Sequence, residues 1–484
     1  MKQYDVVVIG AGATGAAIAW QLSHYDLKVA LVDRCADASF GVSKANSGIV
    51  HGGFHHSADS TLKAKLELEG NEMFDALKSE LDFEFDRCGI LVVAYSEDEL
   101  PALQKLYERG VGNKVPGIEM CSRERLFELE PKLSDTAVAG FFVPRGGVIE
   151  PYGYVFSLVE SAELNGVEFW RNFQAAESVH EGVFRTITAA DGRKIQARFT
   201  VNAAGLYADE VSRICGGEEF EIKPRKGEEY LLDRTSPGRP SKVIFPVPTP
   251  CSKGMLVIPT AGGTTMIGPS ATMIGDKTEN STTQAEREII FEHSQKMIKG
   301  ISERDLVAAF SGLRPVLPGN EDFFIARSEK AADLIQAAGI QSPGLTASPA
   351  IGVYVKNILQ KCGLEMKEKN SPRKILPPKN RARELSDEEI DKLHADEKLA
   401  SRIICRCEFI SEAEIVAAVH RGHVTLDGVK FRTRAGMGRC QGGFCAPKIM
   451  QIISRESGIP MEQLTKRGPG SELLAGKLGD LEVK

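Results

Sequence analysis

The sequence has 484 residues, of which 42% are hydrophobic and 26% are charged, and its formal net charge is −6. At about 150 residues per domain, this length suggests roughly three structural units, and the composition is that of an ordinary globular protein. The slightly acidic balance argues against a nucleic-acid-binding protein, which would need a basic face.

The first buried strand is expected at residues 4–9, close to the N-terminus. Its apolar run is too short for the core of a signal peptide. No stretch reaches the roughly 18 apolar residues of a membrane-spanning helix. We therefore expect a cytoplasmic protein without a transmembrane segment, which is compatible with peripheral membrane association through a partner.

A glycine-rich turn, GAGATG, begins at Gly10, and an expected helix of small residues follows it. Gly10 permits a tight turn, Gly12 lets the backbone approach a pyrophosphate, and Gly15 lets the helix pack closely on the strand. The helix N-terminus offers unpaired N–H groups and a positive dipole end to the phosphates. Asp33 ends the second expected strand, where a carboxylate meets ribose hydroxyls. The pattern predicts a site for a dinucleotide, either FAD or NAD.

Three later segments, at residues 42–53, 200–209 and 337–352, are rich in glycine and other small residues. Such residues are needed where the backbone passes close to a flat ring system. Segment 337–352 also enters a helix whose N-terminus can stabilise negative charge on a reduced flavin. Each segment alone is an ordinary turn between a strand and a helix, but their order favours FAD.

Two side chains are candidates for the substrate site. Arg314 lies in the motif GLRP, and a guanidinium can bind a carboxylate or a phosphate through two hydrogen bonds. His51 lies in HGG, and a histidine has a pKa suited to removing a hydroxyl proton. A structural salt bridge and an ordinary core histidine are the alternatives. We name His51 and Arg314 as the catalytic candidates.

The order GAGATG, NSGIVHGG, STLKAKLELEGNEMF, VNAAGLYAD, FSGLRP and GIQSPGLTASPAIG resembles the D-amino-acid-oxidase-like, or glycine-oxidase-like, FAD oxidoreductases. The resemblance covers about residues 1–365 and is greatest with the glycerol-3-phosphate dehydrogenase and L-2-hydroxyglutarate dehydrogenase branch. It implies an α/β fold, in which a discontinuous Rossmann-like domain binds FAD and an antiparallel-sheet (α+β) domain covers the substrate. We expect residues 1–84, 151–215 and 306–366 in the FAD-binding domain. We expect 85–150 and 216–305 in the substrate domain, with strands at 228–233 and 254–259.

The resemblance also implies which residues contact FAD. These are Gly10, Gly12, Ala13, Thr14, Gly15, Asp33, Arg34, Ser43, Asn46, Ser47, Gly48, Val179, Ala204, Gly205, Gly312, Gly344, Leu345 and Thr346.

In this family the arginine of GLRP points at the anionic end of the substrate, which makes Arg314 the expected anchor. Three further candidate anion contacts are Lys63, Lys65 and Arg225, although a solvated charge is the default for each. His55 and His56 replace the aromatic or arginine side chains that are common in the family. This weakens the transfer of phosphate-binding residues from the classical glycerol-3-phosphate enzymes.

Residues 367–400 are rich in charge and proline, so we expect a linker arm on the surface of the main body. A compact cysteine-bearing module follows at 401–460, and a loosely ordered tail is expected at 461–484. The module contains four of the ten cysteines, Cys405, Cys407, Cys440 and Cys445. In a reducing cytosol such a cluster favours metal binding over disulfides. A capping box at residues 411–414 predicts the start of a helix between the two pairs.

The gaps of one and four residues suit a 2Fe–2S cluster, in which each iron takes two sulfurs, better than zinc, which favours a two-residue gap. CRCE followed by TRAGMGRCQGGFC resembles the bacterioferritin-associated-ferredoxin-like 2Fe–2S domain, over about residues 400–457. This version is fused behind subunits of the anaerobic glycerol-3-phosphate dehydrogenase type. The resemblance implies a small helical domain with the four cysteines as ligands.

A cluster beside a flavin implies a dehydrogenase that passes electrons singly to a partner, an electron-accepting flavoprotein or iron–sulfur subunit. We therefore expect the oxidation of a small anionic 2-hydroxy substrate, with sn-glycerol 3-phosphate as the first candidate. L-2-hydroxyglutarate or another 2-hydroxy acid, and an amino acid, are the rival substrates. Two hypotheses of other classes are a non-catalytic flavin and iron–sulfur electron-transfer subunit, and a simple oxidase with a zinc-bearing regulatory tail.

Overall fold

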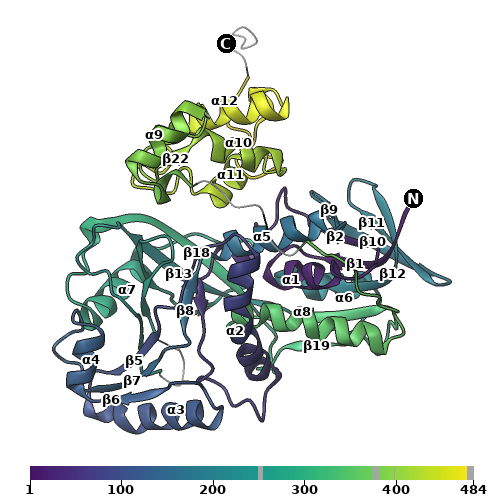
Figure 1. Cartoon of the computed structure of the whole chain (residues 1–484). Helices are drawn as coiled ribbons and strands as arrows, with labels where there is room; N and C mark the ends of the chain where they lie inside the picture. Colours follow the sequence, from purple (N-terminus) through teal and green to yellow (C-terminus); the bar gives the residue numbers. More distant parts are fainter. Residues whose placement is uncertain (249–253, 374–375, 377–380, 397, 477–484) are drawn as a thin grey trace.

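The structure of the protein is a computed structural model, and it describes all residues except 249–253, 374–375, 377–380, 397 and 477–484. Two lobes, each built on a sheet, form the main body, and a small helical domain lies at one end of it (Figure 1). None of the described helices combines the length and the apolar character that a membrane span requires.

The sheet of the first lobe has eight strands among the described residues, and its central strand is β1 (Lys2–Ile9). β1 pairs in parallel with β2 (Val29–Val32) and β12 (Lys194–Asn202), as expected of a Rossmann-like domain. The side chains of residues 6–8 are fully buried, since both faces of this sheet are covered. The other strands are β9 (Glu168–Trp170), β10 (Ala175–Glu181), β11 (Phe184–Ala189), β19 (Phe324–Arg327) and β20 (Leu334–Ala338).

Helices rich in small and apolar residues pack together over the first sheet. α1 (Ala13–Leu22) contacts both α5 (Pro151–Leu164) and α8 (Gly344–Lys361), and α8 also contacts α2 (Leu62–Glu80). A Cβ on Gly352 of α8 would come 2.7 Å from a backbone oxygen of α1, so this glycine permits the close crossing. The short helix α6 (Ala208–Ile214) follows β12.

The sheet of the second lobe has nine strands among the described residues. Its order begins β17-β13-β16-β15-β14 and continues β5-β7-β6. The strands are β5 (Ile90–Ala94), β6 (Glu119–Cys121), β7 (Ala139–Val143), β13 (Lys223–Leu232), β14 (Val243–Pro246), β15 (Leu256–Pro259), β16 (Thr265–Gly268), β17 (Thr272–Met273) and β18 (Leu306–Val316). The helices of this lobe are α3 (Leu100–Gly112), α4 (Arg123–Leu129) and α7 (Gln284–Met297). A small sheet of β3 (Ile49–Val50), β4 (Phe85–Asp86) and β8 (Gly147–Ile149) joins the lobes.

Strand β18 corrects the expected domain boundary at residue 306. It pairs antiparallel with β13 from Val316 to Leu306, so it belongs to the sheet of the second lobe. The expected strands at 228–233 and 254–259 correspond to β13 and β15. The sequence did not show the boundary because β13 and β18 are far apart in the chain, and their pairing is a non-local choice.

The C-terminal domain is helical, as expected. Its elements are α9 (Asp387–Asp396), β21 (Ile403–Cys405), β22 (Ile410–Ser411), α10 (Glu412–His420), α11 (Leu426–Thr433) and α12 (Ala446–Ser457). The expected capping box is present, since Ser411 accepts from the backbone of Glu414 and the Glu414 side chain accepts in return.

Buried ion pairs hold the C-terminal domain against the main body. His423 contacts Asp37 at 2.6 Å and Glu160 at 3.1 Å. Arg432 adds a contact of 2.5 Å to Glu160. These charges are nearly inaccessible to solvent, so separating the domains would leave several buried charges without partners.

Of the expected arm at 367–400, the described residues between 367 and 381 contact the main body. Helix α9 lies with the C-terminal domain instead (Figure 1), which corrects the expected start of that domain at residue 401. Arg381 binds Asp82 at 2.6 Å, and Leu376 is buried. The expected loose tail is anchored at its start, because the backbone N–H of Asp427 donates to the carbonyl of Lys466. Residues 477–484 of the tail lie outside the described residues, as do several residues of the arm.

Candidate active site and iron–sulfur centre

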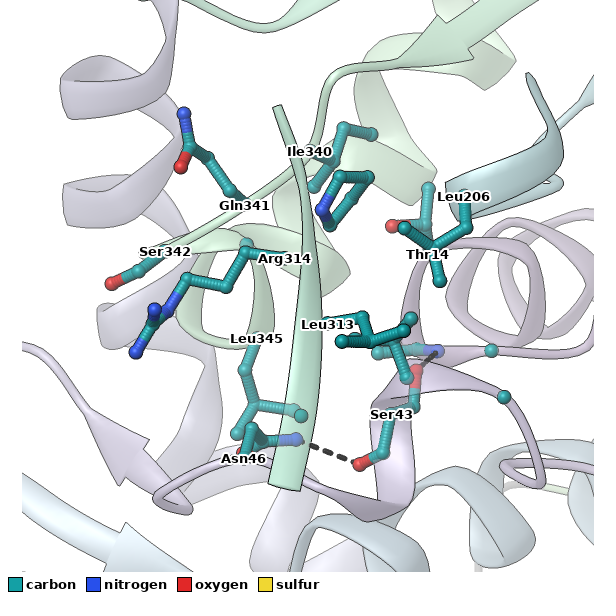
Figure 2. A pocket seen from close by; sticks show the side chains of 18 of the residues that line it. Thr14, Ser43, Asn46, Leu206, Leu313, Arg314, Ile340, Gln341, Ser342 and Leu345 are labelled. Carbon is teal, nitrogen blue, oxygen red and sulfur yellow. Dashed lines mark hydrogen bonds between the residues drawn. The ribbon is translucent and has the colours of Figure 1, made fainter. Parts of the chain in front are cut away.

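A large cavity of about 1420 Å³ lies between the two lobes. Its lining comes from the first sheet, from residues 40–51, from β13 and β18, and from the N-terminus of α8. Figure 2 shows Thr14 and Leu206 on one side of the strand that carries Arg314, with the Arg314 side chain pointing to the other side, near Ser342. The two ends of the cavity thus differ in chemistry, with the glycine-rich turn at one and arginine at the other.

The turn between β1 and α1 lines the cavity with backbone. Gly10 has a φ of +108°, and a Cβ there would come 2.4 Å from the carbonyl oxygen of Ala203. A Cβ on Gly15 would come 1.8 Å from the carbonyl oxygen of Gly10, so α1 packs directly on the turn. Gly12, the N-cap of α1, faces the cavity. This geometry is the one that a pyrophosphate at a helix N-terminus requires.

The carboxylate of Asp33 is fixed at the edge of the cavity. It accepts hydrogen bonds from the backbone N–H groups of Ala11 and Cys35, both at 2.7 Å. Burial raises the pKa of Asp33. Its neighbour Arg34 lies 3.7 Å from the centroid of the Tyr207 ring. Asp33 is therefore placed to accept from ribose hydroxyls.

Most of the expected cofactor contacts line this cavity. They are Gly10, Gly12, Ala13, Thr14, Asp33, Arg34, Ser43, Asn46, Ser47, Gly48, Ala204, Gly205, Gly312, Gly344 and Leu345. Gly15 and Thr346 lie directly behind the lining, where Thr346 accepts from the His51 backbone at 2.9 Å. Val179 is a correction, because it lies on β10 with 55% of its surface exposed and does not line the cavity. Gln174 and Ala175, which precede it on this hairpin, do line it.

His51 is brought to the cavity by β3 and the residues that follow it. Its Nε2 lies 3.2 Å from the hydroxyl of Ser342, which belongs to the loop before α8. The His55 ring lies 5.7 Å away, and Phe245 packs against both. His55 is buried and His56 also lines the cavity. His51 is therefore held between the loop before α8 and the second lobe.

Arg314 and Arg225 are direct partners across the β18–β13 ladder, and both line the cavity. Arg314 donates to the carbonyl of Ser270 at 3.1 Å, and Arg225 donates to Gln341 at 2.7 Å. Among the described residues, Nη1 of Arg314 and Nε of Arg225 are buried without a hydrogen-bond partner. Burial and the charge of Arg225 lower the pKa of Arg314 to about 10. Two guanidinium groups with donors to spare form a site for an anion.

The other two expected anion contacts, Lys63 and Lys65, lie in different surroundings. Lys63 lines the cavity and donates to the carbonyl of Glu321. Lys65 faces outward on α2, where its ammonium lies 3.9 Å from Glu69 with most of its side chain exposed. The prediction of an anion contact therefore fits the position of Lys63 but not that of Lys65.

Glu229 is a site residue that the sequence analysis missed. It is buried in the cavity lining and accepts a hydrogen bond from the hydroxyl of Ser47. Ser47 belongs to residues 42–48, called here the cofactor-facing loop. Burial raises its pKa to about 7, against the opposing effects of Ser47 and Arg314. Because side chains alternate along a strand, the position of Arg225 on β13 was a signal that Gly227 and Glu229 share its face.

The four expected cysteine ligands lie together in the C-terminal domain as two pairs. Cys405 and Cys445 are buried, and their thiols interact. The thiols of Cys407 and Cys440 lie 3.6 Å apart. The backbone N–H of Gly436 points at the Cys405 sulfur at 3.5 Å. Four thiols in two pairs, with a backbone donor to sulfur, fit a cluster of two irons.

Comparison with known proteins agrees with both sites. The family model described as FAD dependent oxidoreductase matches residues 5–358. The chain belongs to this family of FAD-dependent oxidoreductases. A second model, described as a BFD-like 2Fe-2S binding domain, matches residues 403–455. FAD and a 2Fe–2S cluster are therefore its cofactors.

Three relatives place this FAD-dependent oxidoreductase within the family. A glycerol 3-phosphate dehydrogenase of Caloramator mitchellensis is 40% identical over 98% of each chain. The mitochondrial L-2-hydroxyglutarate dehydrogenase of Arabidopsis thaliana is 27% identical over 74% of this chain and 83% of its own. The structure of dithionite-reduced L-alpha-glycerophosphate oxidase from Mycoplasma pneumoniae, with FAD bound, superposes with a TM-score of 0.74 at 27% identity, over 78% of this chain and all of the other.

The residues present fit both cofactors of this FAD-dependent oxidoreductase. The Gly10–Gly12–Gly15 turn and Asp33 would hold the ADP half of FAD, and residues 43–48 would line its ring system. The four cysteines would hold the cluster. The rest of the cavity lies between His51, Glu229 and the two arginines.

Proposed function

We propose that this FAD-dependent oxidoreductase oxidises sn-glycerol 3-phosphate to dihydroxyacetone phosphate and passes the electrons through its 2Fe–2S cluster to a partner protein. The observation that carries the proposal is the pair of Arg225 and Arg314, which face the cavity with unused donors and without a carboxylate partner among the described residues. Two guanidinium groups match the charge of a phosphate monoester. A relative that is 40% identical over 98% of this chain is named a glycerol 3-phosphate dehydrogenase.

The arginines would bind the phosphate and so orient the carbon chain. Arg314 is fixed by the carbonyl of Ser270 and Arg225 by Gln341, so both guanidinium groups are held before the substrate arrives. Preorganised charges lose little freedom on binding. With the phosphate at this end, the secondary hydroxyl would lie toward His51 and the cofactor-facing loop.

His51 is proposed to take the proton of the substrate hydroxyl. Its Nε2 faces Ser342, and its backbone is tied to Thr346 at the start of α8, so the ring has a fixed orientation. When bound, FAD supplies the acceptor for the hydride that leaves the substrate carbon. A histidine near neutral pKa can hold the proton and release it to solvent.

The relay to the cluster is supported by a short connection between the lobes and the C-terminal domain. The backbone N–H of Ile149 donates to the carbonyl of Gly48, in the cofactor-facing loop, at 2.7 Å. The next residue, Glu150, binds Arg434, and Arg434 lies two residues before Gly436, whose N–H points at Cys405. Hydrogen bonds, an ion pair and a few residues of backbone thus connect the cofactor-facing loop with Cys405, a buried ligand of the proposed cluster.

A substrate panel tests the proposal. Holoprotein is assayed with an artificial electron acceptor and sn-glycerol 3-phosphate, L-2-hydroxyglutarate or an amino acid. The proposal predicts the highest kcat/KM with glycerol 3-phosphate. Strong turnover of L-2-hydroxyglutarate without turnover of glycerol 3-phosphate would contradict it, and turnover of none of the three would favour an electron-transfer subunit.

The cytoplasmic location, and an electron-accepting flavoprotein or iron–sulfur subunit as the partner, stay predictions of this proposal. Cell fractionation tests the first of them, and the holoprotein is expected in the cytosolic fraction.

A further inference from the structure

The two cysteine pairs of the C-terminal domain differ in their access to solvent. Cys405 and Cys445 are buried, whereas Cys407 is exposed and Cys440 is half-buried. The buried pair lies beside Gly436, near Arg434. Arg434 binds Glu150, which follows the residue that is hydrogen-bonded to the cofactor-facing loop. The exposed pair opens to the outside of the molecule. The centre therefore has an inner side toward the flavin and an outer side toward solvent.

An exposed aromatic side chain stands beside the outer pair. Phe444 has 83% of its surface exposed and lies between Cys440 and Cys445 in sequence and next to the latter. The loop that carries it is ordered, since Gly443 donates to the carbonyl of Cys440 and Ala446 to that of Gly442. Leaving a phenylalanine side chain in water forgoes the favourable free energy of burying it. Aromatic side chains are enriched in protein interfaces, and Phe444 on this ordered loop is accessible to a partner.

Exposed basic residues flank the same cysteines in sequence. Arg406 and Lys448 are exposed, and neither has an ion-pair partner among the described residues. No aspartate or glutamate occurs between residues 428 and 455 or between 398 and 407, although the whole chain carries a net charge of −6. Glu408 is the nearest acid in sequence, and it is buried against Arg234 and Arg434. The segments that carry the cysteines are thus basic on an acidic protein, and of their exposed cations Arg439 is already paired, with Asp233 of the second lobe at 2.9 Å.

We propose that an acidic one-electron carrier protein docks on this surface, the exit face, formed by Arg406, Cys407, Phe409, Cys440, Phe444 and Lys448. The positive residues attract the carrier and the exposed aromatic side chain gives a small apolar contact. Weak redox encounters use small interfaces of this kind. The inference rests on the proposed relay through the cluster. Each substrate oxidised gives up two electrons and two protons; two carriers take one electron each, and the protons pass to solvent.

The test uses holoprotein and two small cytochromes as probes, an acidic cytochrome and the basic cytochrome c, under anaerobic conditions with glycerol 3-phosphate. Reduction of the acidic cytochrome should be the faster at low salt and should slow as salt rises, because screening weakens attraction between opposite charges. Reduction of the basic cytochrome should be slow and should change in the opposite direction. Equal rates and no salt dependence would overturn the proposal.

Variants locate the effect. Arg406→Glu with Lys448→Glu should lower kcat/KM for the acidic cytochrome at least tenfold, by about the size of electrostatic steering effects, and Phe444→Ala should lower it further. The matched control, Lys105→Glu with Arg304→Glu, changes the net charge equally at exposed sites of the second lobe. Turnover with the artificial acceptor should stay unchanged in all of them. A loss that is the same in both double variants would overturn the exit face.

Two further outcomes keep this test separate from the proposed function. If glycerol 3-phosphate fails to reduce the holoprotein, dithionite-reduced holoprotein is mixed with the same cytochromes, and the same order of rates is expected. If the exit-face double variant instead loses binding to anionic lipid vesicles while its cytochrome kinetics stay normal, the face contacts a membrane and the proposal is wrong.

Discussion

The guanidinium of Arg314 lies over Gly227, so that a Cβ built on Gly227 would come 2.6 Å from Nη2 of Arg314. Gly227 stands on β13 between Arg225 and Glu229, and these three residues share one face of the strand. The missing side chain leaves room for the guanidinium between the second arginine and the buried carboxyl. A row of charges thus runs across the roof of the cavity toward Ser47.

Adding one methyl group at this point should displace the anchor. Gly227→Ala would push the guanidinium of Arg314 off the strand, and we expect KM for glycerol 3-phosphate to rise about tenfold or more, since one charge-assisted hydrogen bond contributes about 1.5–3 kcal/mol. The matched control is Gly275→Ala, where a Cβ would meet nothing within 4 Å. An unchanged KM in a folded Gly227→Ala protein would contradict the role of the close approach.

Removing the anchor itself should weaken substrate binding more than it slows chemistry. For Arg314→Gln we expect KM to rise roughly 10- to 150-fold, from about 1.5–3 kcal/mol of lost charge-assisted bonding, with a smaller effect on kcat. Arg314→Lys should not restore the KM, because an ammonium lacks the planar pair of donors. Arg304→Gln, at an exposed arginine of the same lobe, should behave as the wild type. A purely structural Arg314 would lower the melting temperature and leave KM unchanged.

The buried carboxyl of Glu229 predicts a pH dependence of KM. Its pKa of about 7, raised by burial, means that it is neutral below pH 7 and ionised above. The ionised form places a negative charge near Arg314 and competes with an anionic substrate, so KM should rise as the pH rises from about 6 to 8. Glu229→Gln should abolish this rise while keeping the hydrogen bond to Ser47. Superimposable pH profiles of the two proteins would rule out this role.

Arg434 should control how the C-terminal domain docks. It binds Glu150 of the main body and, at 2.8 Å, Glu408 of its own domain, and all three are buried. Arg434→Gln leaves the buried carboxylate of Glu150 without its cation, at a cost of about 3–5 kcal/mol, while Glu408 keeps Arg234. We expect faster hydrogen exchange at the domain interface and slower electron arrival at the cluster, measured after rapid mixing with substrate. Arg455→Gln removes a half-exposed cation whose buried partner Glu412 keeps Arg402, all within the C-terminal domain, and it should leave both rates unchanged.

The cluster and the flavin should be separable by removing one ligand. Cys407→Ser should lose most of the iron and inorganic sulfide while keeping FAD, because the nucleotide site shares no residue with the cysteine pairs. Turnover with a protein acceptor should fall, and turnover with a small artificial acceptor should persist. Cys362→Ser, at a free cysteine in the main body, is the control. Full iron content in Cys407→Ser would show that this cysteine is not a ligand.

The parts of the fold that are local in sequence were predictable, because their signals are local. In the GAGATG turn, the sequence predicts that Gly10 and Gly15 must lack side chains. In the structure, backbone carbonyl oxygens occupy the space that a Cβ on either residue would need. The capping box at Ser411 was equally readable. The strand β18 was assigned to the wrong domain because its partner β13 is chosen by the whole sheet and not by neighbouring residues.

The positions of Arg314 and His51 at the cavity, and of the four cysteines in two pairs, follow from rare residue types in specific motifs, and the roles of these residues stay predictions. The prediction failed for Val179, which lies on an exposed hairpin whose end, not its middle, reaches the cavity. Glu229 was overlooked because the adjacent Glu228 has the same side chain, and the sequence alone does not show which of them faces the cavity. In the structure, Glu228 points away from the cavity and accepts a hydrogen bond from the hydroxyl of Tyr230 at 2.9 Å. The alternation of side chains from Arg225 along β13 separates the two, because it places Glu229 on the face of the strand that lines the cavity.

The measurement that tests the central claim most directly is an anaerobic titration of holoprotein with sn-glycerol 3-phosphate. Flavin absorbance, at about 450 nm for the oxidised cofactor, and the magnetic resonance signal of the reduced cluster are followed together. The account predicts that the flavin band bleaches and that the cluster signal appears in the same titration. A flavin that keeps its oxidised spectrum with glycerol 3-phosphate, and bleaches with L-2-hydroxyglutarate or an amino acid instead, would contradict it.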